Sequence, residues 1–211
     1  MPFDTWLAFA LASTALLIAP GPTLLMVLSY ALTQGRRVAL ACAAGVAFGD
    51  LIAMSISVIG LGALLLASAT AFTVLKWLGA AYLVYLGVKM IRSSLGVGQK
   101  LALTDKPAGQ SAPKVFRDLA TVTALNPKSN TFFVAFVPQF IDPAAPFAPQ
   151  ASLLIATFVA IATLNALIFA LAANALRARI TRPTVQTWLT RAGGGTLIAM
   201  GIATATLRRA S

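Results

Sequence analysis

Long apolar runs separated by short polar segments are the main pattern of this chain. A membrane-spanning helix needs about 20 consecutive apolar residues, and six runs of about that length appear when the chain is divided at glycine, proline and charge. These runs are residues 6–28, 38–66, 72–91, 116–140, 151–176 and 188–207. Barrel strands are short and alternate apolar with polar residues, whereas these runs are continuous and rich in alanine and leucine. The pattern predicts an all-α membrane protein with six transmembrane helices.

The composition agrees with this prediction. Of 211 residues, 59% are hydrophobic and 10% are charged, against about 25% charged residues in a typical soluble domain. Too few charges remain to cover the surface of a soluble protein. A net charge of +11 suggests nucleic-acid binding in soluble proteins. Here the basic residues fall mainly between the apolar runs, so no nucleic-acid partner is expected.

The positions of these basic residues predict the orientation. The segments after the second and fourth runs contain no lysine or arginine, whereas those after the first, third and fifth contain nine. The nine are Arg36, Arg37, Arg92, Lys100, Lys106, Lys114, Arg177, Arg179 and Arg182. Cytoplasmic segments carry the excess of basic residues, so this set is expected in the cytoplasm, with both termini outside. Arg208 and Arg209 oppose this orientation but are outnumbered.

The available side chains argue against enzyme chemistry. The chain has no histidine and a single cysteine, Cys42, so imidazole bases, intramolecular disulfides and cysteine metal clusters are excluded. All five acidic residues are aspartates that lie far apart in the sequence. We therefore expect no enzyme activity, no cofactor and no metal site.

The two halves of the chain resemble each other. Residues 79–87 (GAAYLVYLG) align without gaps with residues 193–201 (GGGTLIAMG), and proline interrupts the first and fourth runs at corresponding places. An odd number of spans per half gives the halves opposite orientations, as in many secondary transporters. The sequence thus predicts inverted three-helix repeats at 1–92 and 116–211, joined by a cytoplasmic linker at 93–115. The alternative is that small residues recur because they allow close helix packing.

Two proline breaks are the first candidate site. Pro20, Gly21 and Pro22 interrupt the first run, and Asn126-Pro127-Lys128 interrupts the fourth. Proline removes a backbone donor and leaves polar groups that hydrocarbon cannot satisfy, so such breaks normally face protein or a wet cavity. Where a helix restarts, its first N–H groups and positive dipole end can bind a carboxylate. A simple packing kink is the alternative for each break.

Asp50 is the second candidate. It lies within the second run, where an ionised carboxylate costs several kcal/mol unless it is paired or hydrated. It can bind a substrate ammonium, carry a proton or pair with Lys128. A structural ion pair with Lys128 or Lys76 is the alternative. Gly45 and Gly49, just before Asp50, are spaced to bring another helix backbone close to this position.

These residues carry a family resemblance. The Pro20-Gly21-Pro22 break, residues 45–50, 78–83 and 85–87, Asn126-Pro127-Lys128, Phe132-Phe133 and residues 138–140 occur in the order and spacing of one family. Together they make nearly the whole chain similar to the LysE/RhtB family of amino-acid exporters. The resemblance implies a six-span carrier of the bacterial inner membrane that expels amino acids or close derivatives and is driven by the proton gradient.

The resemblance also implies the site residues. The family's motif positions fall here on Pro20, Gly21, Pro22, Asp50, Asn126, Pro127 and Lys128. Thr23 occupies a position where many relatives have asparagine, so its hydrogen bonding is expected to differ. We expect alternating access, with the substrate carboxylate near the breaks and Lys128, its ammonium near Asp50, and protonation of Asp50 coupled to export.

Other interpretations remain at this stage. The expected partners are an amino acid, protons and the lipid bilayer, and a homo-oligomer is left open. A metal-ion or other small-ion exporter is the alternative function, although it would need several acids or soft ligands in its spans. A thiol electron carrier would need two cysteines. A purely structural membrane protein would not require paired breaks.

Overall fold

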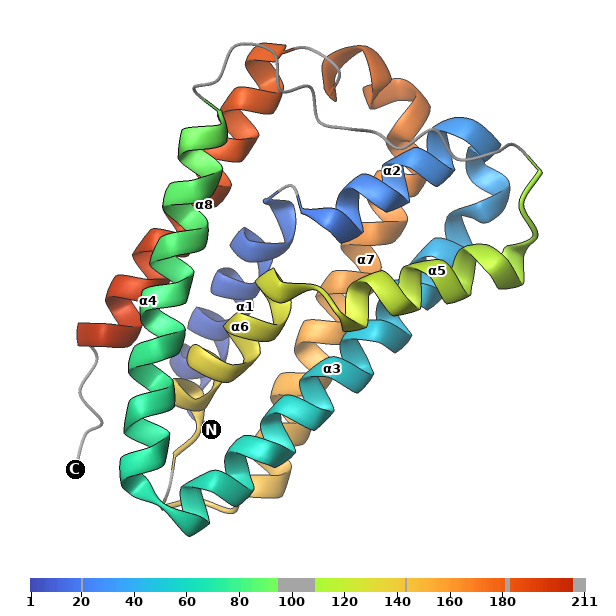
Figure 1. Ribbon diagram of the computed structural model, residues 1–211. Helices are drawn as coiled ribbons and strands as arrows, with labels where there is room; N and C mark the ends of the chain where they lie inside the picture. The colour runs from blue at the N-terminus through green and yellow to red at the C-terminus, as the bar shows by residue number, and fades with distance from the viewer. Residues whose placement is uncertain (20, 95–108, 143, 181–182, 207–211) are drawn as a thin grey trace.

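The described part of the chain is helical throughout its regular structure (Figure 1). The computed structural model describes residues 1–19, 21–94, 109–142, 144–180 and 183–206. Its α-helices are α1 (Phe3–Ile18), α2 (Pro22–Gln34), α3 (Ala39–Ala67), α4 (Ala69–Ser93), α5 (Ala112–Ala124), α6 (Pro127–Ala135), α7 (Phe147–Ile180) and α8 (Pro183–Thr206). Two 3₁₀ helices, Gly35–Val38 and Val137–Phe140, follow α2 and α6. The predicted all-α class is confirmed.

Three helical stretches among the described residues are long and apolar enough to cross a membrane: Pro22–Gly62, Thr73–Ser93 and Phe147–Ala173. In Figure 1 the turn from α2 to α3 and the ends of α4 and α7 lie toward the top. The turns from α3 to α4 and from α6 to α7 lie at the bottom. This alternation is consistent with six spans in an inverted repeat, and both stay predictions.

The first and fourth predicted runs are each divided into two helices. Residues 6–28 fall into α1 and α2, and residues 116–140 fall into α5, α6 and a 3₁₀ turn. Both new helices begin with a proline at their first position, where proline's missing N–H costs nothing because that group has no helical partner. The prolines therefore end one helix and begin the next.

The linker predicted at 93–115 overlaps the helices at both of its ends. Ser93 is the last residue of α4, and α5 begins at Ala112 with Ser111 as its N-cap. Pro113 in the first turn of α5 suits a helix start rather than a loop. Lys100 and Lys106, two of the basic residues used for the orientation, lie outside the described residues.

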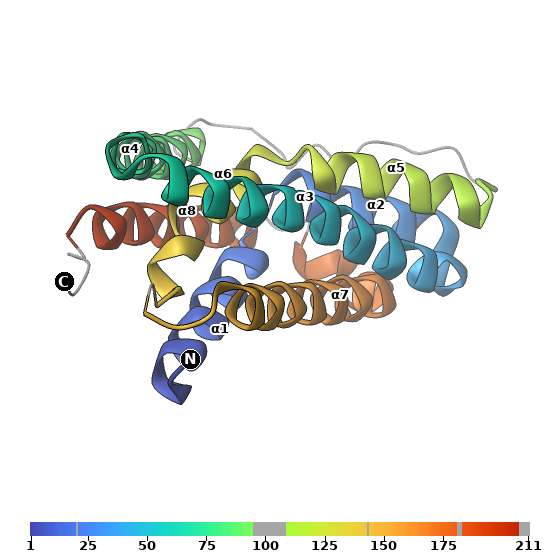
Figure 2. The same ribbon diagram turned by 90° about the horizontal axis from the view of Figure 1, so that it is seen from below.

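The two halves of the chain are interleaved. The broken helix α5–α6 packs on α3 and α4, which belong to the first half, whereas α1 and α2 pack on α7 of the second half. Helix α8 contacts α1 and lies along α4. In Figure 2, α3, α4 and α5 form one layer and α1, α7 and α8 the other. Each half thus supplies its broken helix to the other half.

Glycines allow the closest helix contacts. A Cβ atom at Gly45 or Gly49 of α3 would lie 2.6 Å from a backbone oxygen of α5. A Cβ atom at Gly194 of α8 would lie 2.6 Å from the carbonyl oxygen of Gly87 in α4. These distances are too short for any side chain, so glycine lets the backbones touch. The α3–α5 contact is the close approach predicted for Gly45 and Gly49.

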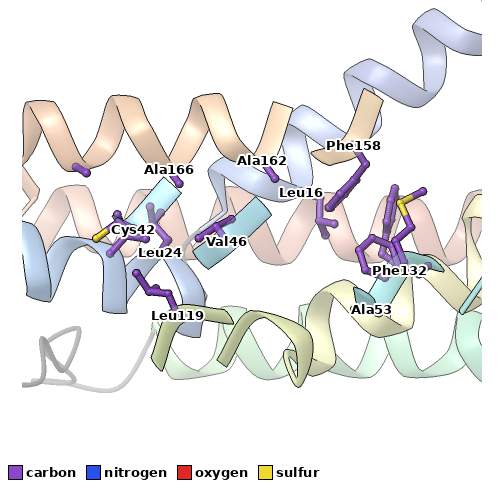
Figure 3. Packing of buried hydrophobic residues seen from close by; sticks show 14 of the residues in the cluster. Leu16, Leu24, Cys42, Val46, Ala53, Leu119, Phe132, Phe158, Ala162 and Ala166 are labelled. Atoms are coloured by element: carbon purple, nitrogen blue, oxygen red, sulfur yellow. The ribbon is translucent and has the colours of Figure 1, made fainter. Parts of the chain in front are cut away.

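Aromatic rings fill the core on one side of the breaks. Phe133 of α6 packs edge-on against Phe158 of α7 with ring centroids 4.8 Å apart, and Phe9 of α1 stacks on Phe132 at 6.2 Å. Beyond Phe158 the buried face of α7 continues with alanines, among them Ala162 and Ala166 (Figure 3). The core is therefore bulky near the α6–α7 turn and thin beside the breaks.

Candidate functional site

Lys128 is the side chain that joins the two broken helices most directly. It is buried at the start of α6, and its Nζ donates hydrogen bonds to the carbonyl oxygens of Leu16 (3.0 Å) and Ala19 (2.8 Å). The last carbonyls of a helix have no partner within it, and in hydrocarbon they need one. A Cβ atom at Gly21 would lie 3.2 Å from this Nζ. Because glycine has no side chain, the ammonium group fits at this position.

Amide side chains bind two further carbonyls at the breaks. Asn165 of α7 donates to the Leu17 carbonyl of α1 at 3.4 Å, and Asn130 donates to the Ala124 carbonyl at the end of α5 at 3.0 Å. Asn126 caps α6, because its side-chain oxygen accepts the backbone N–H of Lys128 at 3.0 Å. Both breaks are thus stabilised by side chains from other segments.

Thr23 connects the first break to the second. Its hydroxyl oxygen accepts a hydrogen bond from Nδ2 of Asn126 at 3.0 Å and lies 3.4 Å from the Thr123 hydroxyl, which donates to it. At this position a hydroxyl therefore bonds to the side-chain amide of Asn126.

Asp50 is buried in α3 with a relative exposure of 1%. Its Oδ1 atom has no hydrogen-bond partner, and Asp50 forms no ion pair within 4 Å with another described residue. The alternative of a structural ion pair with Lys128 or Lys76 is therefore not present at contact distance. A buried carboxylate without a partner is costly, so this oxygen points to a missing ligand or a bound proton.

A cavity brings these residues together. Its empty space, including the part open to solvent, measures about 400 Å³. The residues lining it are Leu17, Gly21, Thr23, Leu24, Val27, Val46, Asp50, Asn126, Lys128, Ser129, Ala162, Asn165 and Ala166. Charged, polar and apolar groups thus face one space beside both breaks.

The predicted site residues divide into three groups. Gly21, Thr23, Asp50, Asn126 and Lys128 all line the cavity. Pro22 and Pro127 begin α2 and α6 with exposed rings and do not line it. Pro20 lies outside the described residues.

Sequence reasoning missed part of the cavity wall. Ser129 and the alanines of α7 line it, but alanine and serine occur throughout this chain and carry no distinguishing pattern. Asn165, a polar residue in the apolar run 151–176, also lines the cavity. No group of three or more histidine, cysteine or acidic side chains that could hold a metal ion occurs in the ranges that the structure describes.

Comparisons with known proteins add the family. The sequence profile of the LysE type translocators matches residues 14–208. The chain is 33% identical to the homoserine/homoserine lactone efflux protein of Salmonella typhimurium strain LT2 over 211 residues, all of both chains. It is 31% identical to the leucine efflux protein of Salmonella typhi over 161 residues, 76% of this chain and 74% of that one.

A further relative, an uncharacterized membrane protein of Vibrio cholerae, is 33% identical over 208 residues, 99% of this chain and all of the other. No solved structure matches the chain. The family profile covers both breaks, Asp50 and the cavity. The chain therefore belongs to the LysE type translocator family and is a multi-pass bacterial membrane protein, a transporter and not an enzyme.

Proposed function

We propose that this protein exports amino acids or close derivatives, and that the substrate binds as a zwitterion between Asp50 and the two broken helices. The observation that carries the proposal is that Asp50, whose buried Oδ1 has no hydrogen-bond partner, lines a cavity that Lys128 also lines. A zwitterion supplies a cation for the carboxylate and an anion for the helix breaks. The relatives named for homoserine and leucine efflux support this substrate class.

Asp50 binds the substrate ammonium in this proposal. An ammonium at this position offers the hydrogen bond and the opposite charge that the carboxylate lacks. A metal or other small ion, the alternative cargo, would meet a single acidic side chain in the cavity. Divalent ions bind where several oxygen or sulfur ligands converge, so the cavity favours the amino acid.

The substrate carboxylate binds at the first turn of α2 and at Lys128. The first intrahelical bond of α2 runs from the Leu25 N–H to the Gly21 carbonyl. The N–H groups of Thr23 and Leu24 precede it and have no partner within α2. The Lys128 ammonium has three donors, of which two are used on carbonyls of α1. One donor remains for an anion.

Neutral amino acids are the preferred substrates. A basic amino acid brings a second cation into a cavity where Asp50 is the one acid among the lining residues and Lys128 is already present. An unpaired charge at this depth costs several kcal/mol. We therefore expect lysine and arginine to bind more weakly than neutral zwitterions.

Export is coupled to the proton gradient through Asp50. A carboxylate that releases the substrate ammonium is left buried and unpaired, and a proton from the outside neutralises it. Release of that proton to the cytoplasm restores the charge that binds the next substrate. The Asp50 carboxylate thus binds the substrate ammonium and a proton in turn, as alternating access requires.

Transport by inside-out membrane vesicles tests this function, because export then appears as accumulation. Vesicles with the protein should accumulate labelled homoserine or leucine when their lumen is acidic, and vesicles without the protein should not. Unlabelled neutral amino acids should compete more strongly than lysine. Equal uptake by both vesicle types would refute amino-acid export. Tighter competition by lysine or arginine would refute the charge argument, and uptake indifferent to the gradient would refute proton coupling.

A further inference from the structure

The cavity has an apolar part on one side of Asp50. Val27 follows Thr23 by one turn of α2, Val46 precedes Asp50 by one turn of α3, and Ala166 follows Ala162 by one turn of α7. Helices α2 and α7 run toward the end of the molecule where α3 begins (Figure 1). The three apolar residues therefore lie on the same side of the polar groups, toward the α2–α3 turn.

Helix α7 supplies small residues at this part of the wall. Phe158, Ala162 and Ala166 follow one another at four-residue spacing and so share one face of the helix. Their relative exposures are 0%, 1% and 3%. Phe158 packs among the phenylalanines of α6, whereas the two alanines line the cavity. Figure 3 shows Leu24 and Val46 facing the part of α7 that carries both alanines.

The apolar part continues from the group that lacks a partner. The Asp50 Oδ1 atom is buried without a hydrogen bond, and Asp50 lines the same cavity as Ala162 and Ala166. An α-amino group on this carboxylate, with the carboxylate of the substrate at the α2 terminus, leaves the substrate side chain as the group without a polar partner. The apolar wall is where such a side chain gains by leaving water.

We propose that Ala162 and Ala166 set the largest substrate side chain that the cavity accepts. This inference rests on the proposed export of amino acids and adds a residue-level size limit to it. The methyl groups of the two alanines leave open the space that the substrate side chain enters beside Val46. A larger residue at either position occupies that space and excludes bulky substrates while leaving small ones bound.

Valine substitutions give the direct test. Valine adds two carbon atoms beyond Cβ, and a single methylene in an apolar pocket changes discrimination by about 10- to 200-fold. The assay measures proton-driven uptake of labelled alanine into inside-out vesicles. The unlabelled competitors are glycine, alanine, valine, leucine and phenylalanine. Ala166→Val or Ala162→Val should raise the half-inhibitory concentration of leucine and phenylalanine at least about tenfold. Those of glycine and alanine should be unchanged.

Ala170 provides a matched control. It lies one turn beyond Ala166 on the same face of α7, is 2% exposed, and does not line the cavity. Ala170→Val overpacks this helix contact outside the cavity, so it should change the half-inhibitory concentrations of all five competitors by the same factor. If Ala162→Val and Ala166→Val also weaken all five competitors equally, the alanines serve helix packing and the size limit is wrong.

A second variant guards against misfolding. Ala166→Gly enlarges the same space, so the half-inhibitory concentration of phenylalanine should fall relative to that of leucine. An unchanged ratio of these two concentrations would overturn the inference. Failure of the wild-type protein to export any amino acid would overturn the proposed function together with the size limit. Export by the wild type with a uniform loss in the variants would overturn the size limit alone.

Discussion

Asp50 and Lys128 have separate tasks at the scale of single residues. The sequence left open whether they pair, and the structure places no ion pair within 4 Å between them. Lys128 instead donates to the Leu16 and Ala19 carbonyls at the end of α1. The Lys128 ammonium thus binds backbone carbonyls at the first break rather than the Asp50 carboxylate. In the proposed function, the Asp50 carboxylate binds the substrate ammonium instead of Lys128.

Replacing Asp50 tests this division. Asp50→Asn keeps the shape of the side chain but removes the charge that attracts an ammonium. Loss of a buried charge partner costs about 3–5 kcal/mol, which corresponds to a loss of about a hundredfold or more in transport. Because the substitution also removes a buried charge, the temperature of unfolding should not fall. Proton-driven uptake into inside-out vesicles and thermal unfolding in detergent measure the two effects.

Asp142→Asn is the matched control, since Asp142 lies exposed in the segment between α6 and α7, where its carboxylate accepts the Ala144 N–H. It should transport like the wild type. Near-normal proton-dependent export by Asp50→Asn would remove Asp50 from the mechanism. A fall in the unfolding temperature would instead mean that Asp50 has a structural partner.

The sequence predicted the breaks but not the contacts that satisfy them. Proline lacks an N–H group, so Pro22 and Pro127 mark interruptions whatever surrounds them. The bond from Lys128 to Leu16 spans 112 residues, and it exists because α6 happens to start beside the end of α1. The same is true of Ala162, whose place in the cavity depends on which face of α7 meets α2. The local sequence pattern does not predict such contacts between residues far apart in the chain.

At the scale of elements, hydrogen bonds join α2, which lines the cavity, to α5. Tyr30 of α2 is fully buried and donates a hydrogen bond to the Asp118 carboxylate of α5. The bond from Thr123 of α5 to Thr23 of α2 joins the same pair of helices nearer the breaks. A substrate can pass between these helices only if α2 moves away from α5. The Tyr30–Asp118 contact is therefore suited to stabilise the closed arrangement.

The single cysteine of the chain can report this motion. Cys42 is fully buried in α3 and lies near Leu24 and Leu119, on α2 and α5 (Figure 3). A hydrogen bond to a charged group contributes about 1.5–3 kcal/mol. We therefore predict that Tyr30→Phe raises the rate of Cys42 alkylation by N-ethylmaleimide about tenfold. Mass spectrometry of the labelled protein over time measures this rate.

Tyr85→Phe is the control for this prediction, because Tyr85 is 55% exposed on α4, which lies on the other side of the molecule from α2 (Figure 1). Its labelling rate should equal that of the wild type. Equal rates for Tyr30→Phe and Tyr85→Phe would mean that the Tyr30 hydroxyl does not hold α2 against α5.

At the scale of the whole molecule, hydrophobic periodicity predicted helices but not their interleaving. The apolar runs show where helices lie, but their pattern does not show which helices pack together. Helix α5 packs on α3, and α1 packs on α7. The aligned glycines gave a better guide. Gly87 and Gly201, which correspond in the two halves, both lie at the contact between α4 and α8.

The two halves nevertheless differ in one arrangement. Gly79 of α4 and Gly193 of α8 correspond in the alignment, but Gly79 packs against Ala135 at the end of α6, whereas Gly193 packs against Ala19 at the end of α1. By the proline alignment, Ala135 corresponds to Tyr30 rather than to Ala19. If the halves are inverted repeats, such asymmetry is expected, because a carrier closed at one end is open at the other.

Reporter fusions test which end of the molecule faces the cytoplasm. The Tyr30–Asp118 contact lies toward the end of the molecule where α2 meets the basic turn with Arg36 and Arg37. The positive-inside rule places that end in the cytoplasm. Fusions within residues 93–115 should therefore be cytoplasmic, with an active fluorescent protein, whereas fusions within residues 142–149 should be external, with active alkaline phosphatase. A fusion at Ser68, in the turn between α3 and α4, serves as the internal check and should behave like those at 142–149. A fully reversed pattern would place the Tyr30–Asp118 contact on the outside, and reporters on one side at all three places would refute the six-span arrangement.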